Sequence, residues 1–114
     1  EMIASFTPGK AIRFGVIVLC DSDNKGLEVE VDSEQKTLRV GSTTAPFDPP
    51  SDEEVQLNIF VDRRVVEVFA NSRQAMVKQH DYAPGDVGVC LFSEGGDSEL
   101  RELQSWTMAA SNAW

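Results

Sequence analysis

The chain is poor in the residues that build metal sites and membrane spans. It has 114 residues with a single histidine and two cysteines far apart, Cys20 and Cys90, which together cannot supply the ligands of a zinc site. Its longest apolar runs, such as residues 16–20, are far shorter than the roughly 20 residues that a bilayer-spanning helix needs. We therefore expect no metal, no cofactor and no membrane partner.

Basic side chains are also scarce. The chain has 10 Lys and Arg against 19 Asp and Glu, which gives a formal net charge of −9 and a pI near 4.4. A surface with this charge repels phosphate backbones, so nucleic acid is not an expected partner.

The motifs of common catalytic sites are missing as well. There is no Gly-x-Ser-x-Gly elbow, and His80 is the only histidine that could serve a nucleophile as base. Gly95 and Gly96 precede an acidic segment, not a helix, and are interpreted as a hairpin turn. The acidic residues could in principle pair as acid and base, but most fall on polar strand faces or loops, where a solvated charge is the simpler interpretation. We predict no catalysis by this chain alone.

What is present is the alternating pattern of half-buried strands. Residues 27–32 and 55–62 place an apolar side chain at every second position, although Phe60 interrupts the polar face of the second segment. Further apolar stretches rich in Val, Ile and Phe cover residues 12–20, 65–70, 74–77 and 87–92, separated by short turn-forming segments. This spacing predicts an all-β domain with antiparallel neighbours.

Three segments need separate interpretation. Residues 42–54 contain Pro46, Pro49 and Pro50 and are predicted to form a surface crossover between sheets. Residues 98–108 fit a strand or an amphipathic helix, and the β context favours the strand. The tail 109–114 is expected to be frayed or to join another part of a protein. We predict one domain over residues 1–114, folded as a two-sheet sandwich or a barrel.

Both cysteines lie in apolar, strand-like segments. A buried free thiol is favoured over a disulfide for this setting, because Cys is among the most often buried residue types. The cellular compartment therefore stays open on these grounds.

Sugar binding would need aromatic rings presented to solvent beside hydrogen-bonding groups. Phe47 in the proline-rich segment, Tyr82 next to a turn, and Trp114 are the candidates for carbohydrate binding, whereas Trp106 is expected in the core. For each candidate, packing against the edge of the sandwich is the favoured interpretation, and sugar binding is the alternative.

Residues 57–76 carry a recognisable motif, which contains Val-Asp-Arg-Arg and Val-Glu-Val-Phe. It resembles the hallmark of the C-terminal β-sandwich module of glycoside hydrolase family 32, which comprises invertases, inulinases and levanases. Residues 14–16 and 88–96 and Trp106 are similar to further parts of that module in the right order. The chain departs from it at Arg64, where a small hydroxyl residue is usual, and at the turn Asn71-Ser72. The resemblance implies an antiparallel two-sheet, lectin-like jelly roll with a strand at 98–108.

The resemblance also implies where the chemistry of the parent enzyme resides. In family 32 the two carboxylates that hydrolyse β-fructofuranosyl linkages belong to a separate N-terminal five-bladed propeller. The corresponding motifs are missing here, since Asp48-Pro49 follows Phe47 and not Arg, and neither cysteine follows a Glu. We therefore expect a noncatalytic piece of a longer glycosidase.

This piece is expected to stabilise the propeller and to contribute to a dimer or to the rim of the substrate pocket. The alternative is an independent module that binds fructan or sucrose. A secreted or periplasmic location is favoured, although similar proteins occur on both sides of the cell membrane.

The same motif contains charged residues that we expect to have a structural role. Asp62 and Arg63 lie at a predicted hairpin tip, and Glu67 falls between apolar neighbours. If Glu67 is buried it must be paired, with Arg63 or Arg73 as the nearest candidates. Asp62, Arg63 and Glu67 are expected to form a structural or interdomain polar network.

Overall fold

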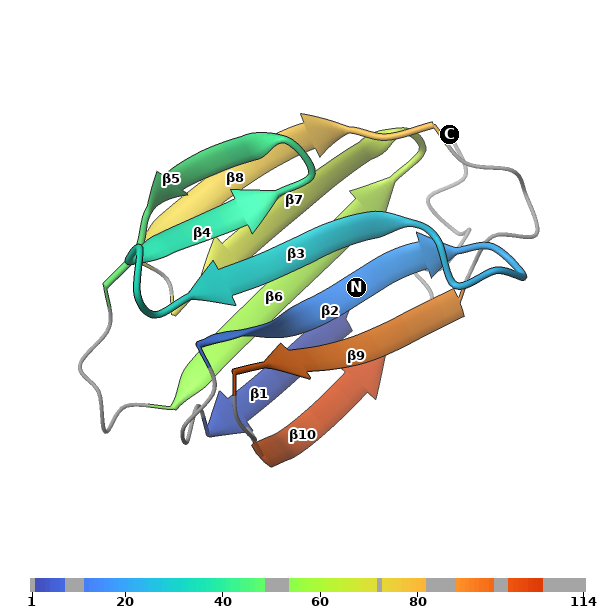
Figure 1. Ribbon diagram of the computed structural model, residues 1–114. Coiled ribbons are helices and arrows are strands. Elements are labelled where there is room, and N and C mark those ends of the chain that lie inside the picture. The colour runs from blue at the N-terminus through green and yellow to red at the C-terminus, as the bar shows by residue number, and fades with distance from the viewer. Residues whose placement is uncertain are drawn as a thin grey trace.

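The computed structural model describes residues 2–7, 12–48, 54–71, 73–81 and 88–95, together with the backbone of residues 99–105. Within these residues the chain forms two antiparallel five-stranded sheets that stack as a sandwich (Figure 1). The predicted all-β, two-sheet architecture is confirmed. No helix in the described part is long and apolar enough to cross a bilayer.

Each sheet is built mainly from strands that are consecutive in the chain, β6 to β8 in sheet A and β2 to β5 in sheet B. Sheet A has the order β10-β1-β6-β7-β8, and sheet B has the order β5-β4-β3-β2-β9. The strands are β1 (Met2–Thr7), β2 (Arg13–Cys20), β3 (Leu27–Asp32), β4 (Thr37–Val40), β5 (Thr43–Pro46), β6 (Val55–Asp62), β7 (Val65–Ala70), β8 (Gln74–Gln79), β9 (Gly88–Glu94) and β10 (Glu99–Ser105).

The core lies between the sheets and follows the alternation of the sequence. Leu57 and Ile59 of β6 point inward from sheet A, and Val29 of β3 points inward from sheet B, each at most 1% exposed. The rings of Phe6 and Phe14 meet across the layers with centroids 5.3 Å apart. Apolar burial by both inner faces thus joins the sheets.

Short turns set the register of the strands. In the β6–β7 hairpin, Asp62 pairs with Val65, and Arg63 between them has a positive φ of 57°. In the β3–β4 turn, Oδ1 of Asp32 accepts hydrogen bonds from the backbone N–H groups of Glu34 and Gln35, at 3.0 and 2.8 Å. The predicted turns after β3 and β6 therefore form as local connections, and the Asp32 side chain stabilises the one after β3.

Several sequence predictions need correction. β1, β4 and β5 were not predicted, and residues 43–46 of the expected crossover form β5, an edge strand, where a proline is tolerated. The predicted hairpin at Gly95 and Gly96 is wrong, because β9 belongs to sheet B and β10 to sheet A. The strand predicted within residues 98–108 is confirmed for residues 99–105, which form β10, and the rest of that range lies outside the described residues.

At one edge the two sheets are joined by polar side chains. Nε2 of Gln74 on β8 donates to the carbonyl oxygen of Pro46 on β5 at 2.7 Å. Nζ of Lys78 donates to the hydroxyls of Ser42 and Thr43, at 3.2 and 3.4 Å. These contacts hold β5 and β8 side by side, as Figure 1 shows.

Candidate functional site

The outer face of sheet A carries apolar side chains. Phe60 of β6 and Phe69 of β7 meet edge to face, with ring centroids 5.8 Å apart and an interplanar angle of 85°. Val77 of β8 is 67% exposed. Together with Ala75, which lies opposite Phe69, they form what we call the sheet A patch: Phe60, Phe69, Ala75 and Val77. An exposed group of apolar side chains of this kind marks a candidate interaction surface.

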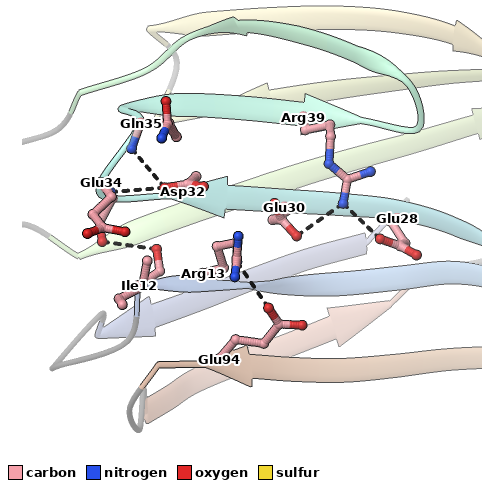
Figure 2. A network of polar contacts seen from close by, with 10 residues as sticks. Ile12, Arg13, Glu28, Glu30, Asp32, Glu34, Gln35, Arg39 and Glu94 are labelled. Atoms are coloured by element: carbon pink, nitrogen blue, oxygen red, sulfur yellow. Dashed lines mark hydrogen bonds and ion pairs between the residues drawn. The ribbon is translucent and has the colours of Figure 1, made fainter.

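The outer face of sheet B is polar and internally paired. Nη2 of Arg39 on β4 donates to Glu28 at 2.8 Å and to Glu30 at 3.0 Å, as Figure 2 shows. Nη1 of Arg39 donates to the carbonyl oxygen of Gly41 at 2.6 Å. The hydrogen bond to Glu28, and then that to Glu30, raises the pKa of Arg39 against the opposing effect of burial. On β2, Arg13 pairs with Glu94 at 3.0 Å.

Arg39 therefore donates hydrogen bonds to three acceptors at once. A guanidinium suits this arrangement because its donors lie in a fixed planar fork. Within the part of the chain that the structure describes, this face presents charges that already have partners, and it shows no group of three or more His, Cys, Asp or Glu that could hold a metal ion.

The structure separates the charged residues of the family motif. Asp62 and Arg63 sit exposed at the β6–β7 turn, while Glu67 is exposed on β7 between Phe60 and Val77 in cross-strand register. No hydrogen bond or ion pair joins these three described side chains to each other. Glu67 needs no buried partner because it faces solvent. The polar network expected within the module is therefore not formed, and a contact of these residues with another domain stays a prediction.

Of the two interpretations of Phe47, the structure supports packing within the sandwich and contradicts a solvent-exposed ring that binds sugar. Phe47 is 4% exposed and belongs to the hydrophobic core, and its backbone N–H donates to the carbonyl oxygen of Lys36 at 2.9 Å. The residue that follows β5 therefore packs its ring into the core between the two sheets. Tyr82, Trp106 and Trp114 lie outside the described residues, so their predicted roles stay predictions.

The cysteines come together although 70 positions separate them. Sγ of Cys20 on β2 lies 3.7 Å from Sγ of Cys90 on β9, and both thiols are free. Cys20 is 4% exposed, as expected for a buried thiol, and Cys90 is half-buried. Burial, with smaller contributions from Cys90, raises the pKa of Cys20 from 9.0 to about 11. Nothing in the local sequence of either cysteine indicated this proximity.

Sequence reasoning therefore missed two features of the described residues, the sheet A patch and the cysteine pair. The sheet A patch had one visible signal, the presence of Phe60 on the otherwise polar face of its strand. The cysteine pair had none, because it depends on which strands become neighbours.

Comparison with known families agrees with the fold and the motif. The family described as "Glycosyl hydrolases family 32 C terminal" matches residues 1–107. No individual curated protein matches the chain. Since the family match covers nearly the whole sequence, and the structure has the two-sheet sandwich that the motif implied, the chain belongs to the C-terminal domain family of the family 32 glycoside hydrolases.

Proposed function

We propose that this chain is the noncatalytic accessory sandwich of a β-fructofuranosidase-like enzyme, and that it packs against and stabilises the catalytic propeller. Membership in the C-terminal family carries the proposal. The absence from the sequence of the propeller motifs with their two carboxylates supports it.

The docking surface in this proposal is the sheet A patch. Its residues belong to β6, β7 and β8, and Phe60 and Phe69 fall inside residues 57–76, the segment that resembles the family hallmark. Covering Phe60, Phe69 and Val77 removes apolar area from water, which favours association by roughly 25 cal/mol for each Å². Glu67 lies between Phe60 and Val77 on this face, so a partner that docks here has to offer its carboxylate a donor or a cation. Docking on the outer face of sheet B would instead desolvate the ion pairs of both Arg39 and Arg13.

The test is association with a family 32 propeller expressed without its own C-terminal module. Val77 on β8 and Thr44 on β5 are both exposed residues on edge strands, one in each sheet, so Val77→Asp and Thr44→Asp form a matched pair. We expect Val77→Asp to weaken binding about tenfold or more, equal to about 1.4 kcal/mol, and Thr44→Asp to leave it unchanged. Equal affinities for the two variants would contradict docking through sheet A.

Sugar binding is the alternative function, and one titration distinguishes it from docking on the propeller. Calorimetry of the chain with sucrose, inulin and levan, with hydrolysis assayed in the same samples, is expected to give neither saturable heat nor turnover. Saturable heat without turnover would identify a carbohydrate-binding module instead. The burial of Phe47 weighs against this alternative, because a buried ring cannot stack on a sugar.

Self-association is a further outcome that the same samples can reveal. Sedimentation of the chain alone measures whether the sheet A patch pairs with a second copy. A dimer that Val77→Asp dissociates and Thr44→Asp does not would assign the patch to dimer formation, as opposed to docking on the propeller.

A further inference from the structure

The two cysteines are brought together by an irregularity in β2. Between Val18 and Cys20 the register with β9 shifts, so that Val18 pairs with Val89 and Cys20 pairs with Gly88. The residue between them, Leu19, has a positive φ of 57°. A bulky residue in this region of backbone space is a genuine outlier, and such outliers concentrate at sites with a role beyond packing.

This β-bulge decides which face of the sheet Cys20 occupies. In a regular ladder Leu19 would oppose Gly88, and Cys20 would point to the opposite side of sheet B from Cys90. With one extra residue in β2, Cys20 takes the position opposite Gly88, which shares a face with Cys90 two residues later on β9. The bulge therefore creates the proximity of the two sulfur atoms.

Gly88 leaves room for this arrangement. A Cβ atom at position 88 would lie 3.1 Å from Cβ of Cys20 and 3.2 Å from its carbonyl oxygen, closer than most real Cβ contacts. Sγ of Cys20 is held 3.2 Å from the carbonyl oxygen of Ile17, on the same strand, and 3.7 Å from Sγ of Cys90. The strain at Leu19, the missing side chain at Gly88 and the sulfur proximity point to one site.

We propose that Cys20 and Cys90 form a thiol–disulfide modification site, in which a low-molecular-weight disulfide such as oxidised glutathione converts the two thiols into an intramolecular disulfide between β2 and β9. The sulfur atoms need to approach by only about 1.7 Å to reach disulfide length. This property is separate from the proposed docking function.

The reaction is two successive exchanges. The half-buried Cys90, as its thiolate, attacks one sulfur of oxidised glutathione, forming a mixed disulfide and releasing one glutathione thiolate. Cys20, as its thiolate, then attacks the Cys90 sulfur, which forms the Cys20–Cys90 bond and releases the second glutathione. Two protein thiols are oxidised, one glutathione disulfide is reduced to two thiols, and the two protons leave with them.

The consequence is a covalent link between two neighbouring strands, β2 and β9, at one edge of sheet B. Among the described residues, β9 is an edge strand of sheet B, and its one neighbour in that sheet is β2. The disulfide would join residues 70 positions apart, which removes much of the freedom of the unfolded chain and favours the folded state.

The experiment uses the chain as it stands, incubated with oxidised or with reduced glutathione. Mass spectrometry is expected to show the loss of two hydrogen atoms after oxidation, and a peptide map should join Cys20 to Cys90. The melting temperature should rise by roughly 10 °C or more relative to the reduced chain. The Cys20→Ser/Cys90→Ser double variant provides the control and should melt at the same temperature under both conditions.

Other products would overturn the proposal. Persistent glutathione adducts on Cys90 without an intramolecular link would mean that the second exchange does not occur. Dimers joined through Cys90 would assign the thiol to intermolecular chemistry. If the disulfide-linked chain melts at the same temperature as the reduced chain, the disulfide does not stabilise the β2–β9 edge of sheet B.

Discussion

The outer faces of sheets A and B differ in the kind of side chain they present and in whether those side chains find partners within the module. On sheet B, Arg39 holds Glu28 and Glu30, so the charged groups find their partners within the module. On sheet A, Phe60 and Phe69 pair with each other and Val77 remains exposed. The inner faces of the two sheets are alike, since both bury aliphatic side chains. The contrast indicates that the sandwich is stabilised by its core, and that its outer faces are suited to different surroundings.

The largest expected effect is common to both sheets and tests whether they share one core. Leu57 in sheet A and Leu38 in sheet B are both fully buried. We expect Leu57→Ala and Leu38→Ala each to lower the free energy of unfolding by about 2–5 kcal/mol, through lost burial and an unfilled cavity. Urea denaturation measures both. A loss below about 1 kcal/mol in only one sheet would show that the sheets contribute unequally.

The next effect should be confined to sheet B. Replacing Arg39 with Met removes the donors of Glu28, Glu30 and the Gly41 carbonyl while keeping an apolar stem. We expect a loss of about 1–2 kcal/mol in low salt, which shrinks in about 1 M salt because the ion pairs are already screened. Arg39→Lys is the control and should recover part of the loss. An effect of equal size at both salt concentrations would show that packing of the stem matters more than charge.

A smaller, salt-independent effect is expected in sheet A. A double-mutant cycle of Phe60→Leu and Phe69→Leu isolates the contact between the two rings. We expect a coupling free energy of about 0.5–1.5 kcal/mol in both low and high salt. Additive single effects would show that the edge-to-face geometry contributes nothing beyond apolar burial.

The smallest effect concerns a loop of sheet B. Backbone N–H groups of Lys25 and Asp23 donate to Oδ1 of Asp21 and lower its pKa below 3.8. A carboxyl whose pKa falls on folding stabilises the fold above its unfolded pKa, and this contribution is lost as pH falls through the lower folded value. NMR titration of Asp21 is therefore expected to show a midpoint below pH 3.8. The Asp21→Ala variant should lose less free energy of unfolding on acidification than the unsubstituted chain does. Equal losses in the two proteins would contradict a stabilising role of the Asp21 carboxylate.

Much of the fold was predictable because the long strands carry regular patterns. β3, β6 and β7 have the predicted bounds. Apolar and polar residues alternate in β3 and, apart from Phe60, in β6, whereas β7 is an apolar run interrupted only by Glu67. β1 escaped detection because the apolar Ile3, between the buried Met2 and Ala4, breaks the alternation of apolar and polar residues. β5 is short and ends at Pro46, so its sequence resembles a loop.

The candidate surfaces were less predictable because they depend on contacts between distant segments. Phe47 was a candidate for exposure because it lies in the proline-rich segment, but the structure buries its ring in the core directly after β5. Glu67 was expected to need a partner if buried, yet its strand places it on the solvent side. The cysteine pair requires both the neighbouring of β2 with β9 and a one-residue bulge, neither of which is encoded by local periodicity.

The central claim is that this sandwich stabilises a propeller by binding to it, and thermal unfolding of the propeller tests it most directly. A family 32 propeller expressed alone should unfold about 5 °C higher when the chain is present well above its dissociation constant, because a partner that binds only the folded state stabilises it. Val77→Asp should lose this effect at the same concentration, and Thr44→Asp should retain it. An unchanged unfolding temperature at saturating concentrations of the chain would contradict the claim.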